Sequence, residues 1–140
     1  VVSKLAAEGD PDAIPFPRAM LHSGDLRFSL SGLKTAVVTY INNERAAGRE
    51  LNVPDICASF TAAVVDVQVA KARAALRETG APTFCLGGGV AANPTLRAAY
   101  EQMCAGRAPR DAAARLLRRQ RRHDRRSGAR PLSGRGVLAA

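Results

Sequence analysis

Tryptophan is absent from this 140-residue chain, and all aromatic residues together make up only 4% of it. The chain also lacks a run of 18 apolar residues, so we expect no membrane span. Its first residues, Val1 to Lys4, match neither a secretory signal peptide nor an initiator methionine. We interpret the chain as a processed protein or a piece of a longer one, with 46% apolar residues to build a modest core.

Cysteine and histidine, the residues that most often bind transition metals, are scarce. Cys57, Cys85 and Cys104 are widely spaced and include no CxxC pair. We interpret them as reduced, buried thiols of a cytoplasmic protein. The two histidines, His22 and His123, lie about a hundred residues apart in the sequence and form no HxxxH motif.

Lysine is absent after residue 106, although the net charge of the chain is +9. Residues 1–106 contain 10 basic and 10 acidic residues, whereas residues 107–140 contain 11 arginines against Asp111 and Asp124, which gives 11 − 2 = +9. The 107–140 segment has no Ile, Phe or Tyr either, so it cannot bury enough apolar surface to offset chain entropy. We expect a neutral domain over 1–106 and a disordered arginine-rich tail over 107–140, without tertiary packing and with at most a helix near Ala112–Gln120.

The first part of the domain reads as loop with short regular segments. Val2–Glu8 fits the end of a helix, and Leu26–Leu30 alternates apolar with polar residues, which predicts a short half-buried strand. Apolar residues then recur at helical spacing, predicting a helix over 31–47 that is capped by Ser31 and ended by Gly48.

A longer helix is predicted to begin at Asn52–Asp55, where Pro54 suits the first turn, and to stop at Gly80 and Pro82. Its expected buried stripe is Ile56, Phe60, Val64, Val67, Ala70 and Ala74.

The most informative stretch of the chain follows this helix. Thr83–Leu86 is predicted to be a buried strand, Gly87–Gly89 a glycine turn, and Asn93 the cap of a helix that Pro94 begins and Gly106 ends. Such a strand–turn–helix unit brings backbone N–H groups and a helix N-terminus to a phosphate or nucleotide. A tight structural turn, with Asn93 acting only as a cap, is the alternative reading.

Ser29, Ser31 and Lys34 invite a comparison with serine nucleophiles activated by lysine. No histidine or carboxylate is placed to complete a triad, so a capped helix with a solvated lysine is favoured. Asp55 and Asp66 are interpreted as a helix-start charge and a solvated carboxylate.

Four strings occur in one order along 1–106: Phe16 to Met20, Phe28 to Thr35, Asp55 to Phe60, and Gly88 to Asn93 followed by Leu96-Arg97. In combination they resemble the tRNA threonylcarbamoyladenosine synthase family, which is TsaD-like and was formerly called glycoprotease-like. The resemblance implies an α/β, mainly helical chain forming part of the second lobe of an actin-like ATPase fold. It also implies transfer of a threonylcarbamoyl group from threonylcarbamoyl-AMP to the adenosine beside the tRNA anticodon.

The resemblance further implies a set of ligands and partners. Family members bind threonylcarbamoyl-AMP or ATP, tRNA and one divalent metal, iron or zinc, and other proteins of a tRNA-modifying complex are possible partners. Asn93 is carried over as a substrate-binding residue, with Gly88 and Gly89 allowing close backbone approach. The family's HxxxH and Asp-Asn metal motifs are missing here, so we assign no metal ligand and no catalytic residue. We expect this fragment to be inactive alone.

The arginine-rich tail has two competing interpretations. Back-translated with GC-rich codons and shifted by one base, Arg110–Ser127 reads Ala-Thr-Leu-Pro-Pro-Ala-Cys-Cys-Gly-Asp-Asn-Ala-Ala-Met-Ile-Ala-Ala, which restores the Asp-Asn motif. Residues from about 108 onward would then be an out-of-frame translation. The alternative is a small RNA-binding or interaction module that acts through the basic tail, although no aromatic residue is available there to stack on bases.

Overall fold

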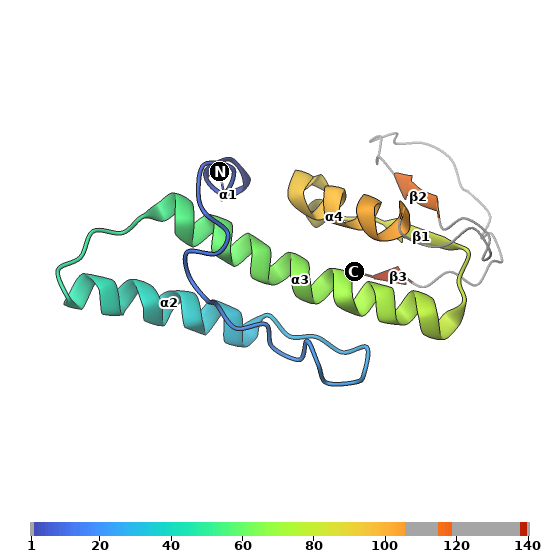
Figure 1. The fold of residues 1–140 in the computed structure, drawn as a ribbon, viewed down its shortest axis with the longest axis horizontal. Helices are drawn as coiled ribbons and strands as arrows, with labels where there is room; N and C mark the ends of the chain where they lie inside the picture. The colour runs from blue at the N-terminus through green and yellow to red at the C-terminus, as the bar shows by residue number, and fades with distance from the viewer. Residues whose placement is uncertain (1, 106–114, 119–137, 140) are drawn as a thin grey trace, which may run out of the picture.

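The computed structural model describes residues 2–105, 115–118 and 138–139 (Figure 1). In chain order the elements are α1 (Val2–Leu5), α2 (Ser31–Ala46), α3 (Val53–Thr79), β1 (Thr83–Leu86), the 3-10 turn η1 (Gly89–Ala92), α4 (Pro94–Ala105), β2 (Arg115–Arg118) and β3 (Leu138–Ala139). The long helix α3 contacts α1, α2 and α4, and β1 lies beside α4 (Figure 1). The described part of the chain is therefore mainly helical with a small sheet, in keeping with the predicted α/β class.

Helix α2 confirms the predicted helix but begins one residue earlier than a Ser31 cap requires. Ser31 is its first helical residue, and the preceding Leu30 makes no side-chain capping bond. The Ser31 N–H instead donates to the hydroxyl of Ser29 at 3.3 Å. Gly48 ends the helix as predicted, because it adopts a φ of 66° and donates its N–H to the carbonyl of Arg45.

Helix α3 begins and ends as the sequence predicts. The side chain of Asn52 accepts a hydrogen bond from the Asp55 N–H at 3.2 Å, and Gly80 takes the left-handed conformation at the C-terminus. Of the predicted stripe only Ile56 and Val67 are buried, whereas Phe60, Val64, Ala70 and Ala74 are half-buried. The buried surface differs from the prediction because α1, α2 and α4 all pack on this helix. Its buried residues are Ile56, Ala58, Ser59, Thr61, Ala63, Val67, Lys71, Ala72 and Leu76.

By length and composition, α3 is also apolar enough to cross a membrane, although the sequence contains no run of 18 apolar residues. The core helix of a soluble protein meets the same criterion. Here α3 contacts three other helices of the chain, and its Lys71 side chain is buried against a loop. These contacts are those of a central packing helix.

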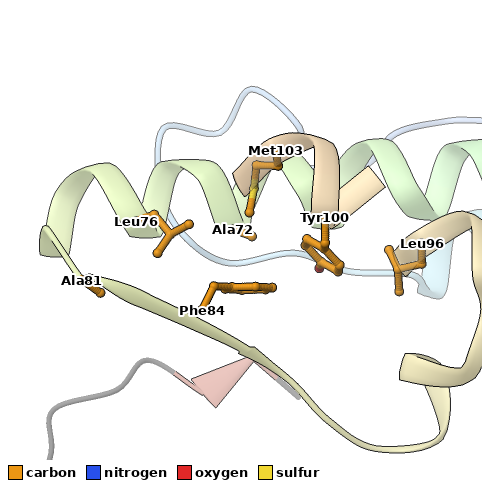
Figure 2. Close-up of a cluster of buried hydrophobic side chains, with 7 residues drawn as sticks. All are labelled: Ala72, Leu76, Ala81, Phe84, Leu96, Tyr100 and Met103. Atoms are coloured by element: carbon orange, nitrogen blue, oxygen red, sulfur yellow. The ribbon is translucent and has the colours of Figure 1, made fainter. Parts of the chain in front are cut away.

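Two clusters of buried side chains hold the helices together. The loop-side core joins the N-terminal loop to α2 and α3, and consists of Ile14, Phe16, Leu33, Ile56 and Ala63. The strand-side core joins α3, β1 and α4 and consists of Ala72, Leu76, Ala81, Phe84, Leu96, Tyr100 and Met103 (Figure 2).

Within the strand-side core, Phe84 of β1 packs against Tyr100 of α4, with ring centroids 4.8 Å apart. The Tyr100 hydroxyl donates to Gln68 Oε1 at 3.3 Å, and burial raises the pKa of Tyr100 to about 12. This packing fixes α4 against both β1 and α3. It therefore also fixes the turn that connects β1 to α4.

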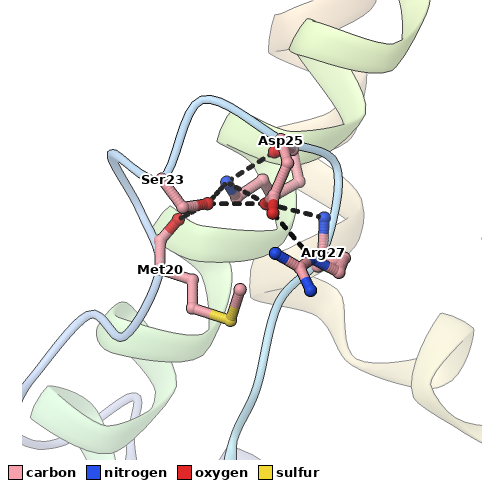
Figure 3. A network of polar contacts seen from close by, with 5 residues as sticks. Met20, Ser23, Asp25 and Arg27 are labelled. Atoms are coloured by element: carbon pink, nitrogen blue, oxygen red, sulfur yellow. Dashed lines mark hydrogen bonds and ion pairs between the residues drawn. The ribbon is translucent and has the colours of Figure 1, made fainter.

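The predicted strand over Leu26–Leu30 is wrong. The segment is irregular, and Leu26 and Phe28 are 39% and 40% exposed. Alternation gives a half-buried strand only where another strand supplies hydrogen bonds, and within residues 2–105 none lies beside this segment. The preceding loop is held by a polar contact with α3 instead (Figure 3).

The absence of tertiary packing expected for 107–140 is wrong for two short segments. β2 and β3 each pair in parallel with β1, giving the strand order β2-β1-β3. Arg115–Arg118 is thus a strand, where at most a helix was expected. The reason is that β1 offers unpaired backbone groups on both edges, which any extended segment can satisfy. The rest of the tail, and the predicted helix end at Gly106, lie outside the described residues.

Candidate functional site

The strand–turn–helix unit singled out in the sequence forms a continuous structural feature, which we call the glycine turn (Gly87–Asn93). It connects the end of β1 to the start of α4 and contains η1. Gly88 adopts a φ of 83°, a conformation that side chains rarely accept. The Ala91 N–H donates to the Gly88 carbonyl at 3.2 Å and closes the turn.

Asn93 caps α4 through its side-chain oxygen, as predicted. Oδ1 accepts two hydrogen bonds, from the N–H of Thr95 at 2.9 Å and from the N–H of Leu96 at 3.2 Å. The amide Nδ2 has no hydrogen-bond partner among residues 2–105, and the side chain is only half-buried. Within the described residues the cap therefore uses only the acceptor of Asn93, and its two N–H donors remain for a ligand.

The glycines leave the backbone of the turn open. Gly87, Gly88 and Gly89 are exposed, and a Cβ built on any of them would meet no atom within 4 Å. Only Gly88 needs to be glycine for its backbone conformation. This open backbone lies beside the first turn of α4, whose Thr95 and Leu96 N–H groups are already bonded to Asn93 Oδ1. A ligand therefore has access to the glycine backbone, and the positive end of the α4 dipole favours a polar or anionic one.

Arg97 belongs to this site, and the sequence reading assigned it no role. Its guanidinium Nη2 donates to the Ala91 carbonyl at 2.8 Å, while its backbone N–H donates to the Asn93 carbonyl at 3.1 Å. Its spacing could have indicated this role, because Arg97 follows Asn93 by four residues and helical side chains lean back toward the N-terminus of their helix. Arg97 thus ties η1 to α4.

The other polar residues considered in the sequence do not join the glycine turn. Ser29 accepts a hydrogen bond from the N–H of Ser31, and Lys34 is exposed on α2, which agrees with the predicted solvated lysine but not with a cap at Ser31. Asp55 accepts hydrogen bonds from the N–H of Asp10 at 2.9 Å and from the amide of Asn52 at 2.6 Å.

Asp66, interpreted from the sequence as a solvated carboxylate, is half-exposed but forms an ion pair. Its Oδ2 lies 3.0 Å from Nε of Arg18. Arg18 also donates to the Phe16 carbonyl at 2.9 Å, so this carboxylate helps to attach the N-terminal loop to α3.

A serine–lysine contact does occur elsewhere. Lys71 Nζ donates to Ser23 Oγ at 2.8 Å and to the Asp25 carbonyl at 2.7 Å, and lies 3.8 Å from Asp25 Oδ1 (Figure 3). Lys71 thus donates two hydrogen bonds and forms an ion pair with a carboxylate, which is a structural contact between α3 and the loop and not the arrangement of a serine nucleophile with its base. We call these residues, Ser23, Asp25 and Lys71, the loop clasp.

The residues that the structure describes do not fit the metal implied by the resemblance. Across 2–105, 115–118 and 138–139, no group of three or more His, Cys, Asp or Glu side chains could hold a metal ion. His22 is exposed in a loop, and His123 lies outside the described residues. No chemical step is therefore derived through a metal.

Comparison with known proteins identifies the family. The sequence model of the TsaD family, described as tRNA N6-adenosine threonylcarbamoyltransferase, matches residues 1–120. The chain belongs to the TsaD family. The match extends beyond the boundary of 106 expected from the motifs.

Three proteins named tRNA N6-adenosine threonylcarbamoyltransferase illustrate the relationship. The protein of Desulfitobacterium hafniense is 53% identical over 96 residues, which cover 69% of this chain and 28% of the relative. The protein of Corynebacterium diphtheriae is 48% identical over 110 residues, covering 74% of this chain and 31% of the relative. The protein of Moorella thermoacetica is 51% identical over 96 residues, again 69% of this chain and 28% of the relative. The chain thus spans less than a third of the length of these relatives.

Proposed function

We propose that this chain supplies part of the second, actin-like lobe of a tRNA threonylcarbamoyltransferase, and that its glycine turn binds the nucleotide part of threonylcarbamoyl-AMP. Asn93 Nδ2 would donate to the nucleotide, and the backbone of Gly88 and Gly89 would approach it closely. The observation that carries the proposal is the hydrogen bonding of Asn93: its oxygen accepts both capping bonds, whereas its N–H donors have no partner within the described residues. Membership of the TsaD family supports it.

Asn93→Ser tests this proposal without removing the cap. The serine hydroxyl remains a good acceptor for the first N–H groups of α4, but the amide donors are lost. We expect AMP and adenosine to shift the amide resonances of Gly88 and Gly89 in the wild-type chain. In Asn93→Ser the affinity should fall about tenfold at unchanged helix content. Equal affinities, or no binding by the wild type, would refute the proposal.

We also propose that the 140-residue polypeptide does not complete threonylcarbamoyl transfer by itself. Its match to the relatives covers less than a third of their length, and acyl transfer needs charge stabilisation assembled around the reacting atoms. The test is incubation with threonylcarbamoyl-AMP and tRNA, followed by nucleoside analysis. Detection of threonylcarbamoyladenosine above the level without protein would overturn this statement. We also propose a cytoplasmic location, as expected for a member of the TsaD family.

The frame-shift reading of residues from about 108 onward is a separate proposal. It rests on the confinement of the whole +9 charge to 107–140 and on the Asp-Asn motif that appears after a one-base shift. Sequencing the coding DNA across this region tests it. An in-frame relative that ends in the same arginine-rich segment would exclude a frame shift.

The rival function, RNA binding through the basic tail, is favoured by that same charge distribution. It predicts that tRNA affinity falls steeply with salt, and that four substitutions together, Arg121→Gln, Arg122→Gln, Arg125→Gln and Arg126→Gln, reduce the slope of log affinity against log salt by about 3. Under the nucleotide-site proposal, these substitutions leave AMP binding unchanged. The two measurements separate the two functions.

A further inference from the structure

Arg97 occupies a central place in the hydrogen bonds of the glycine turn. Gly88 O accepts from the Ala91 N–H, Ala91 O accepts from the Arg97 guanidinium at 2.8 Å, and Asn93 O accepts from the Arg97 N–H. One residue therefore touches both η1 and the first turn of α4. Because the Cβ positions of Gly87 to Gly89 meet no atom within 4 Å, side-chain packing does not hold the turn from that side.

The guanidinium bond has no replacement within the described part of the chain. The Ala91 carbonyl accepts from a half-buried arginine, and within residues 2–105 no second donor reaches that oxygen. Without Arg97 the closing bond from Ala91 to Gly88 would remain, but the link from η1 to α4 would be reduced to the short backbone connection through Asn93. The turn would then be free to rotate its N–H groups relative to the Asn93 amide.

We propose that Arg97 is a positioning residue for the nucleotide site: acting through the Ala91 carbonyl, it holds the backbone of Gly88 and Gly89 in register with Nδ2 of Asn93. This inference rests on the proposed function, since the ligand is the nucleotide assigned to the glycine turn. It differs from a role as a phosphate ligand, which would need the guanidinium to touch the ligand itself. The two roles make different predictions for charged and uncharged ligands.

The test compares Arg97→Met with Arg97→Lys, and uses Arg73→Met as the matched control, because Arg73 is exposed on α3 far along the chain from the turn. Binding of adenosine and of AMP is measured for each full-length variant. A positioning residue affects both ligands alike, so Arg97→Met should weaken adenosine and AMP each by about tenfold. Arg97→Lys, which keeps a donor for the carbonyl, should recover most of the affinity, and Arg73→Met should bind as the wild type does.

Amide hydrogen exchange gives a readout that needs no ligand. Arg97→Met should speed exchange of the Ala91 N–H about tenfold while leaving the amide of Val67, in the middle of α3, unchanged. General unfolding would instead speed exchange at both positions.

Three outcomes overturn the inference: a loss confined to AMP, which would make Arg97 a phosphate ligand; unchanged binding of both ligands; or unchanged exchange at Ala91. If the wild type binds neither ligand, the proposed function fails, and the exchange result alone decides whether Arg97 holds the turn.

Discussion

Lys71 Nζ lies 2.7 Å from the main-chain oxygen of Asp25, a residue 46 positions earlier in the chain. The same amine donates to Ser23 Oγ, and only 6% of Lys71 is exposed. A long charged side chain on the central helix thus holds an irregular loop that pairs with none of the described strands. Because a buried amine needs all of its donors satisfied, this contact is specific as well as stabilising.

Removing the amine should therefore destabilise the fold. Lys71→Met keeps the apolar stem but deprives two oxygens of a charged donor, and we expect the free energy of unfolding to fall by about 2 kcal/mol. Urea denaturation followed by circular dichroism measures the change. Arg73→Met, at an exposed position two residues on, should change stability by less than about 0.5 kcal/mol. Equal losses of unfolding free energy in the two variants would contradict a stabilising role for the loop clasp.

The loop clasp also predicts acid sensitivity. Hydrogen bonds from Ser23 and Arg27 lower the pKa of Asp25 from 3.8 to about 2. A carboxylate whose folded pKa is depressed contributes stability above its unfolded pKa, and this contribution is lost as the pH falls through the folded value. Stability should hence decline between about pH 4 and pH 2.

Asp25→Asn should remove part of that decline. Glu44 also has a lowered pKa, because Arg49 donates two hydrogen bonds to it at 2.7 Å, so some acid sensitivity should remain. Thermal unfolding at a series of pH values from 2 to 6 measures the stability of the wild type and of the variant. If the stability of the wild type and of Asp25→Asn fell in parallel with pH, Asp25 would have no part in the acid sensitivity.

The strand-side core predicts a large effect of a single truncation. Leu96 is 1% exposed and lies in the first turns of α4, between β1 and α3 (Figure 2). Leu96→Ala should cost about 3 kcal/mol, because it removes buried apolar surface and leaves a cavity. Val38→Ala, on the outer face of α2 where the side chain is 50% exposed, is the control and should be close to neutral. The comparison is made by chemical denaturation, and similar losses in both variants would disprove the assigned core.

The glycines of the turn should respond differently to the same substitution. Gly88→Ala forces a Cβ onto a φ of 83° and should cost about 1 kcal/mol, although no atom lies within 4 Å of the new methyl. Gly89 does not have a positive φ and has open space for a methyl group, so Gly89→Ala should leave stability unchanged. Gly88→Asn should cost less than Gly88→Ala, since asparagine tolerates the left-handed region better. Thermal unfolding of the three variants tests this order, which a purely steric role for Gly88 would not produce.

The sequence was a sound guide where the determinants are local. The ends of α3 follow from Asn52 and Gly80, and the start of α4 follows from Asn93, because caps depend on residues within one helical turn. The strand at Thr83–Leu86 followed from its apolar run and the glycines after it, although only Phe84 is buried and Cys85, predicted to be a buried thiol, is exposed. The family was also evident from four short strings, and the comparison confirms it.

Features that depend on distant partners could not be read in this way. The alternating Leu26–Leu30 segment had the pattern of a strand, but a strand also needs a neighbour, and the described fold provides none there. The arginine-rich tail had the composition of a disordered segment, yet β1 pairs with two short pieces of it. The clasp from Lys71 to Asp25 has no signature in either stretch alone.

The candidate site also has features that depend on local sequence and features that depend on distant contacts. The glycine turn, the cap at Asn93 and the helix after it could be predicted from the residues alone, because backbone conformation and capping act over a few positions. The packed fold was needed to see that the Asn93 oxygen accepts both capping bonds while its N–H donors have no partner within residues 2–105, and that Arg97 reaches back to Ala91. The physical reason is that hydrogen-bond partners depend on where side chains point once α4 is packed against β1 and α3, which no local pattern specifies.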